Sequence, residues 1–129
     1  MTNIIQAPAL NINKILYKGD IPPHIRREQR IVANLIYYMQ KAGWKVSEVF
    51  DGEEFTPVGS TIEAMEIIFN LDEALLYFRK GIDSSHQVGH NVTLILGNDL
   101  DIICDWTYSK GDADGFNALM STFDTEDYA

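Results

Sequence analysis

The amino-acid sequence predicts an α+β fold, with a mainly antiparallel sheet of roughly four strands and helices packed on one face. Three observations support this class: an amphipathic helical pattern after two prolines, short apolar runs separated by turn residues, and a hairpin pattern at residues 90–108. The expected order is helix, strand, helix, three consecutive strands and a closing helix. With 129 residues, 46% of them hydrophobic, the chain has the size of a single domain (1–129) and needs no metal or disulfide to fold.

The two ends of the chain have weaker patterns. Residues 1–20 contain leucines and isoleucines that need burial, but neither helical nor strand periodicity is clear there. We expect an N-terminal arm that packs on this domain or on a second subunit, and the sequence leaves both options open. A short helix at 113–122, capped by Asp112 or Asp114, is expected to close the fold. The acidic residues 124–129 are expected to form a frayed tail.

The clearest element is a helix from about Ile25 to Ala42. Pro22 and Pro23 stand at its start, where proline is tolerated because its missing N–H would be unpaired anyway. Gly43 suits the position that follows a helix. Apolar residues recur at helical spacing along one stripe: Ile31, Val32, Leu35, Tyr38, Met39 and Ala42.

A strand and a second helix are expected next. Residues 44–50 alternate in a way that predicts a strand, and a loop follows through residues 51–59. Ser60 and Glu63 form a capping-box pattern, in which Ser60 accepts a hydrogen bond from the Glu63 N–H and the Glu63 carboxylate reaches back. We therefore expect a helix from Thr61 to about Leu71.

Residues 71–80 are compatible with two structures. As a helix, their apolar side chains would form a stripe; as a strand, the run ALLYFRK at 74–80 is short, aromatic and bounded by turn residues. Asn70 and Asp72 compete for backbone hydrogen bonds inside helices, so we favour a break there and a strand at 74–80. The polar residues 81–89 are expected to form a loop.

The segment HNVTLILGNDLDIICDWTY, residues 90–108, predicts a β-hairpin. A three-residue loop at 98–100 would pair Leu94 with Cys104 and Val92 with Trp106. This register points the apolar side chains, Cys104 included, toward the helices, whereas a two-residue turn would mix the faces. The residues expected on the opposite face are Thr93, Ile95, Asp101, Ile103 and Asp105.

The chain is acidic, with a formal net charge of −9. This charge repels phosphates and anionic lipids, which argues against a general nucleic-acid or membrane binder. Cys104 is the only cysteine, so no intramolecular disulfide can form, which suits a reducing compartment. No apolar run has the length of a secretory signal or a membrane span, and we expect a cytoplasmic protein.

His86 and His90 are the candidate metal ligands. Their i, i+4 spacing would place two imidazoles on one helix face, but a glycine interrupts it and we prefer two loop histidines. Asp101 and Asp105 would lie about 13 Å apart along a strand, which disfavours a shared cation. Cys104 is expected to be an inert core thiol. The sequence therefore predicts no metal, no cofactor and no catalytic residue.

Three arginines and two aspartates are the candidate partner-binding residues. Arg26, Arg27 and Arg30 stand near the start of the first helix, where the helix dipole disfavours cations. They either form salt bridges with acidic side chains or bind an acidic partner. Asp101 and Asp105 would be available on the outward face of the hairpin.

Two classes of function remain open. The first is a small acidic interaction or regulatory protein without catalytic activity, such as an inhibitor, an immunity-type protein or a chaperone-like protein. It would act on another protein or form a homodimer. The second is a small metal-assisted hydrolase that uses His86, His90, Asp101 or Asp105. Convergence of these side chains in one pocket would favour the enzyme.

Overall fold

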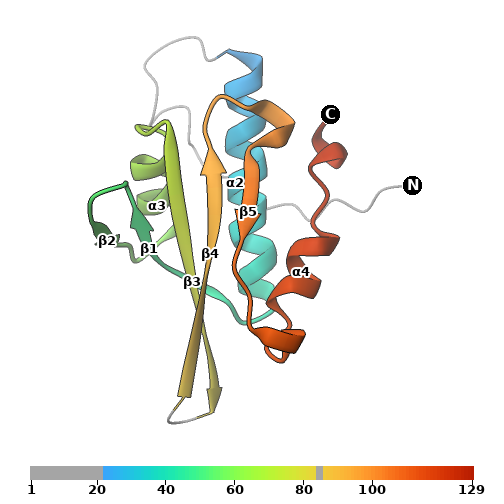
Figure 1. The fold of residues 1–129 in the computed structure, drawn as a ribbon. Helices are drawn as coiled ribbons and strands as arrows, with labels where there is room; N and C mark the ends of the chain where they lie inside the picture. The colour runs from blue at the N-terminus through green and yellow to red at the C-terminus, as the bar shows by residue number, and fades with distance from the viewer. Residues whose placement is uncertain (1–21, 84–85) are drawn as a thin grey trace.

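The computed structural model describes residues 22–83 and 86–129, and among these the side chains of 82, 83 and 86 are not described. The described chain forms an α+β fold around an antiparallel sheet of five strands, in the order β2-β1-β3-β4-β5 (Figure 1). The predicted arm at 1–20 lies outside the described residues. The elements are α2 (Pro23–Lys41), β1 (Lys45–Phe50), β2 (Phe55–Pro57), α3 (Thr61–Ile68), β3 (Glu73–Asp83), β4 (His86–Ile95), β5 (Ile103–Trp106) and α4 (Phe116–Thr122), with 3-10 turns η1 (Asp99–Asp101), η2 (Lys110–Asp112) and η3 (Thr125–Tyr128).

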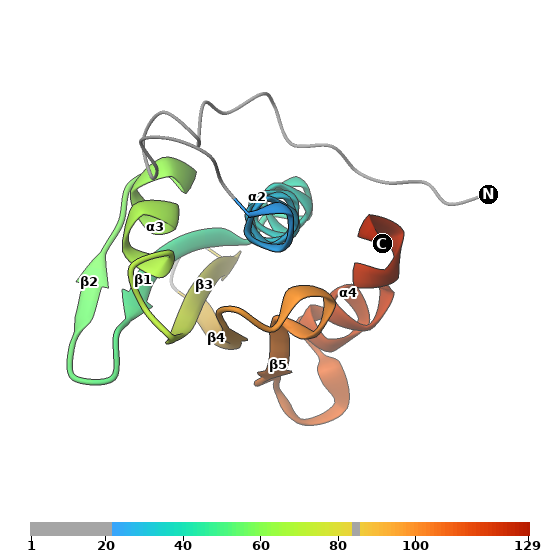
Figure 2. The same cartoon turned by 90° about the horizontal axis from the view of Figure 1, so that it is seen from above.

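The predicted fold class is confirmed, and the helices cover one face of the sheet. Helices α2 and α3 lie side by side on that face, and α4 continues the layer at the β5 end (Figure 2). The buried stripe of α2 contains Ile31, Val32, Leu35, Ile36 and Met39. The helix begins and ends within two residues of the expected positions. No helix among the described residues is long and apolar enough to cross a membrane.

Helix α3 begins as expected but ends early. Ser60 accepts a hydrogen bond from the Glu63 N–H, as the capping box predicts. The Glu63 carboxylate, however, accepts from the Gly59 N–H, one residue earlier than a standard capping box. The expected end at Leu71 is wrong, because Asn70 turns its side-chain amide onto the carbonyl of Glu66 and closes the helix.

Strand β2 is an element that the sequence did not predict. Its three residues pair with β1 through Phe55 and Phe50, Thr56 and Val49, and Pro57 and Glu48. Three residues are too few to display an alternating pattern. Pro57 is compatible with pairing because β2 is an edge strand, where proline's missing N–H costs no ladder bond.

The strand interpretation of residues 74–80 is correct, but the loop expected at 81–89 is wrong. The β3–β4 ladder continues outward to the pair Gly81 and Gln87 and then to Asp83 and His86. This end of the hairpin projects beyond the neighbouring strands (Figure 1). The ladder therefore extends through a polar segment whose sequence shows no strand periodicity.

A β-bulge changes the predicted register of β4 and β5. Val92 pairs with Trp106 as expected, but Leu94 pairs with Ile103 and not with Cys104. The extra residue places both Cys104 and Asp105 opposite Thr93. Cys104 is therefore exposed, and Ile103 packs against the core. The expected orientations of these two side chains are both wrong.

The C-terminal residues contribute to the core. Tyr128 in η3 is only 5% exposed, and its ring lies 6.0 Å from that of Phe123. Burial raises the pKa of the Tyr128 hydroxyl, which also has a hydrogen bond with the buried Asn34 side chain. The tail is therefore not frayed at Tyr128, contrary to the expectation for residues 124–129.

Candidate interaction surface

His90 lies in the core side of the sheet, not in a loop. It is 8% exposed, and its ring stands 5.5 Å from Trp44 and 4.9 Å from Phe116. Its Nε2 atom is 2.5 Å from Oδ2 of Asp114. Burial acts to raise the pKa of Asp114, but hydrogen bonds with His90 and the Phe116 N–H outweigh it and hold that pKa below its usual value. This pair joins β4 to the start of α4.

The other candidate metal ligand, His86, lies on the same strand as His90. Four residues along a strand separate two Cα atoms by about 13 Å. The i, i+4 spacing brings two imidazoles together only on a helix, so it does not predict a chelate site on this strand. Within the described residues, no group of three or more His, Cys, Asp and Glu side chains could hold a metal ion.

Asp101 and Asp105 do not converge with His90. Asp101 is exposed in η1, beyond the end of β4. Asp105 is exposed on the face of the sheet that the helices leave open, where its carboxylate accepts a hydrogen bond from the Trp106 N–H. Since His90 points into the helix layer, it and Asp105 lie on opposite faces of the sheet.

The three arginines have separate surroundings. The Arg27 guanidinium forms a salt bridge of 2.9 Å with Asp99. Arg30 lies over the ring of Tyr128, 5.6 Å from its centroid. Arg26 is exposed. Arg27 therefore forms a salt bridge with an acidic side chain, which is one of the two alternatives proposed, whereas Arg30 packs on Tyr128. Binding of an acidic partner by any of the three arginines stays a prediction.

Glu28 is a buried residue that the sequence analysis missed. Its carboxylate, on α2, accepts hydrogen bonds from the Gly97 N–H at 2.8 Å and the Asp99 N–H at 3.2 Å. It fixes the β4–β5 turn, in which Asp99 has a positive φ of 55°. Glu28 precedes Ile31 and Val32 by three and four residues, so its position on the apolar stripe was the available signal.

The open face of the sheet carries three aromatic side chains, Phe50, Phe55 and Tyr77, which we call the aromatic platform. The Phe50 and Phe55 rings are 4.6 Å apart, and those of Phe55 and Tyr77 are 6.3 Å apart. Phe55 is 49% exposed. The neighbouring residues Val49 and Leu76 are fully buried toward the helices, so strand alternation directs the platform away from them.

The Tyr77 ring packs closely against its neighbours on the sheet. A Cβ atom at Gly89 would lie 2.6 Å from the Tyr77 ring, so the ring occupies space that only glycine leaves free. The Arg79 guanidinium lies over the Tyr77 ring, 4.8 Å from its centroid, and also forms a salt bridge of 3.1 Å with Glu48. These contacts restrict the rotation of Tyr77 and make the platform a preformed surface.

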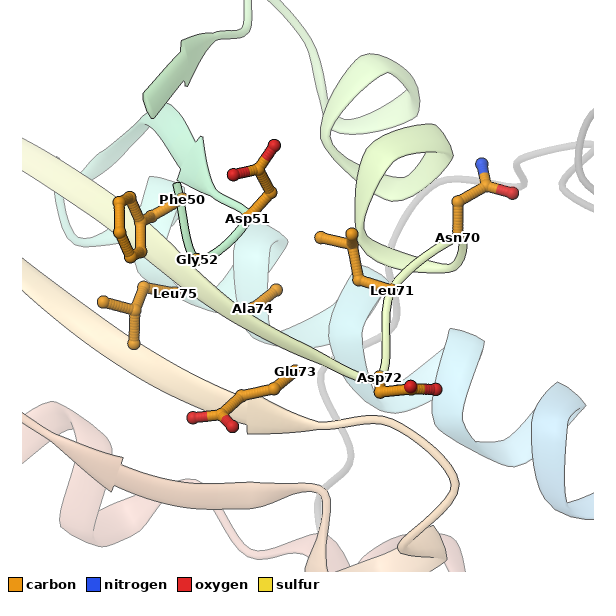
Figure 3. A pocket seen from close by; sticks show the side chains of 9 residues that line it. All are labelled: Phe50, Asp51, Gly52, Asn70, Leu71, Asp72, Glu73, Ala74 and Leu75. Carbon is orange, nitrogen blue, oxygen red and sulfur yellow. The ribbon is translucent and has the colours of Figure 1, made fainter. Parts of the chain in front are cut away.

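A cleft of about 540 Å³ adjoins the platform where β1 ends and β3 begins (Figure 3). Phe50 and Leu75 belong both to the open face and to the lining of this cleft. Asp51 lines it on the β1 side, and hydrogen bonds from the N–H groups of Glu54 and Glu53 lower the pKa of this carboxyl. The remaining acidic lining residues, Asp72 and Glu73, are exposed.

Comparisons with known proteins identify no family or function for this chain. No family model, no curated protein and no solved structure matches the chain. The functional argument therefore depends on the residues alone.

Proposed function

We propose that this chain is a non-catalytic interaction protein that binds another protein through the open face of its sheet. The supporting observation is the aromatic platform, because a half-exposed phenylalanine packed against two further rings is costly to leave in water. Among the described residues, the helices all lie on the other face (Figure 2). Aromatic residues on a preformed surface are typical anchors of protein interfaces.

The alternative, a metal-assisted hydrolase, has less support. Its residues would have to act on one substrate, yet His90 is buried beside Asp114 and Asp105 is exposed on the opposite face. Asp101 stands at a third place, in η1. The exposed thiol of Cys104 fits a reducing compartment, so we assign the interaction to the cytoplasm.

Site-specific photo-crosslinking tests this proposal. A benzophenone amino acid is placed at position 55 or, as a matched control, at Tyr108, which is 53% exposed and lies outside the platform. We expect one protein from the native lysate to be captured at position 55 and not at 108. The purified captured protein should then bind the chain, and Phe55→Glu should weaken this binding at least tenfold.

Other occupants of the face would give different products. Crosslinks from position 55 only to a second copy would mean a homodimer, and crosslinks only to residues 1–21 of the same chain would mean an internal cover. Either result, or equal capture at positions 55 and 108, would overturn the proposal of a separate partner.

A further inference from the structure

Most of the charges near the aromatic platform are negative, and the cation closest to it is Arg79 over the Tyr77 ring. Between Lys45 and Arg79 the chain has no lysine or arginine, and it has eight acidic residues: Glu48, Asp51, Glu53, Glu54, Glu63, Glu66, Asp72 and Glu73. This stretch, 46–78, forms β2, α3 and most of β1 and β3. Glu63 and Glu66 lie on α3, which packs on the other face of the sheet, and the remaining six acidic residues lie in β1 and β3 or directly beside them, in the part of the sheet that carries the platform. It contributes −8 of the net charge of −9.

The two cations that border the stretch neutralise only a small part of its charge. Arg79 pairs with one of the eight carboxylates, that of Glu48, and also lies over the ring of Tyr77. Lys45 pairs along the backbone with Arg79, at the end of β1 far from Phe50 and the cleft. Glu53 and Glu54, in the turn between β1 and β2, are exposed beside Phe55. The rings therefore lie in a region of mainly negative electrostatic potential. This potential attracts a positively charged partner, repels an acidic one and does not attract a neutral one.

We infer that the segment bound by the aromatic platform is positively charged, with apolar side chains that contact the rings and lysine or arginine side chains that face the surrounding carboxylates. This inference rests on the proposed function and adds the chemistry of the partner. Charge complementarity of this kind accelerates association and excludes acidic competitors. Long basic side chains suit the surface because their alkyl stems pack on apolar groups while the charged end reaches outward.

The cleft gives such a side chain a place beside the platform. Phe50 and Leu75 line the cleft and offer apolar contact, and Leu71 lies across from Asp51 (Figure 3). Backbone hydrogen bonds from the N–H groups of Glu54 and Glu53 lower the pKa of the Asp51 carboxyl and so favour its ionised form. A lysine or arginine side chain that extends from the rings into the cleft would pack its alkyl stem on the apolar lining residues and place its charged end near the Asp51 carboxylate.

Two synthetic peptides of equal length serve as probes, one alternating leucine with lysine and the other alternating leucine with glutamate. Binding to the full chain is followed by amide NMR shifts and by titration. We expect the lysine peptide to shift the amides of Phe50, Phe55 and Tyr77, and the glutamate peptide to leave them unchanged. The double variant Glu53→Lys/Glu54→Lys should weaken binding of the lysine peptide about tenfold, as expected for reversing two exposed charges.

A matched control separates a local effect from net charge. Asp101→Lys/Glu126→Lys changes the net charge equally at exposed positions outside the platform, and it should leave the affinity within about twofold. Equal weakening in both double variants, shifts spread over the whole surface, or no preference between the peptides would overturn the inference. If crosslinking at position 55 captures a partner whose contact segment is acidic, the proposed function stands and this inference fails.

Discussion

Replacing Glu28 by glutamine tests whether α2 fixes the β4–β5 turn. The Glu28 side chain is fully buried, and its two oxygens accept from the N–H groups of Gly97 and Asp99. Glutamine keeps one acceptor oxygen but turns an NH₂ donor toward the other N–H. One hydrogen bond to a charged group is therefore lost, and a buried donor is left unpaired, which costs about 1.5–3 kcal/mol.

The expected result is a fall of about 2 kcal/mol in the free energy of unfolding, read from urea denaturation as a lower midpoint at constant slope. Glu28→Ala removes both acceptors and leaves a cavity, so its loss should be larger, about 3–5 kcal/mol. Hydrogen exchange should accelerate at the Gly97 and Asp99 amides in both variants.

Glu66→Gln is the matched control, because Glu66 is exposed on α3 and should change stability by less than about 0.5 kcal/mol. An unchanged urea midpoint for Glu28→Gln, with the two turn amides still protected, would refute the reasoning. Equal losses in the two glutamine variants would show that the effect is one of net charge.

Three other predictions follow from the packing. The pKa of Asp114 is lowered in the folded state, so its stabilisation is present above the unfolded value of 3.8 and is lost as the pH falls toward the folded value; acid titrations of stability should therefore be flatter in Asp114→Asn than in the parent. Gly89→Ala should displace Tyr77, lower stability by about 1–3 kcal/mol and change the near-ultraviolet circular dichroism, whereas Gly81→Ala, which has open space around its Cβ, should do neither. The exposed Cys104 should react fully with a thiol reagent in the native protein, and protection until denaturation would contradict the bulge.

The elements that depend on local chemistry could be predicted from the sequence. The apolar stripe of α2 and the Ser60 cap of α3 are written in residues close to one another along the chain. The strand at 74–80 also followed from local arguments, because Asn70 and Asp72 disfavour helix there. The structure confirms these elements, with end points displaced by a few residues.

The features that depend on distant partners could not be predicted. The bulge that exposes Cys104 lets both Ile103 and Trp106 pack against the core, because strict alternation would direct two side chains three residues apart on β5 to opposite faces. The buried Glu28 finds its donors 69 and 71 residues away. The aromatic platform joins three strands, and its members, Phe50, Phe55 and Tyr77, look like ordinary strand residues until the pairing is known.

The hydrogen bonds from the β4–β5 turn to Glu28 on α2 also affect when α2 can pack on the sheet during protein synthesis. Glu28 leaves the ribosome about seventy residues before Gly97 and Asp99, the groups that satisfy its carboxylate. Burying an ionised carboxylate without partners is strongly unfavourable, so α2 cannot settle on the growing sheet while those donors are missing. We therefore expect a nascent chain stalled before residue 97 to keep α2 undocked and sensitive to protease.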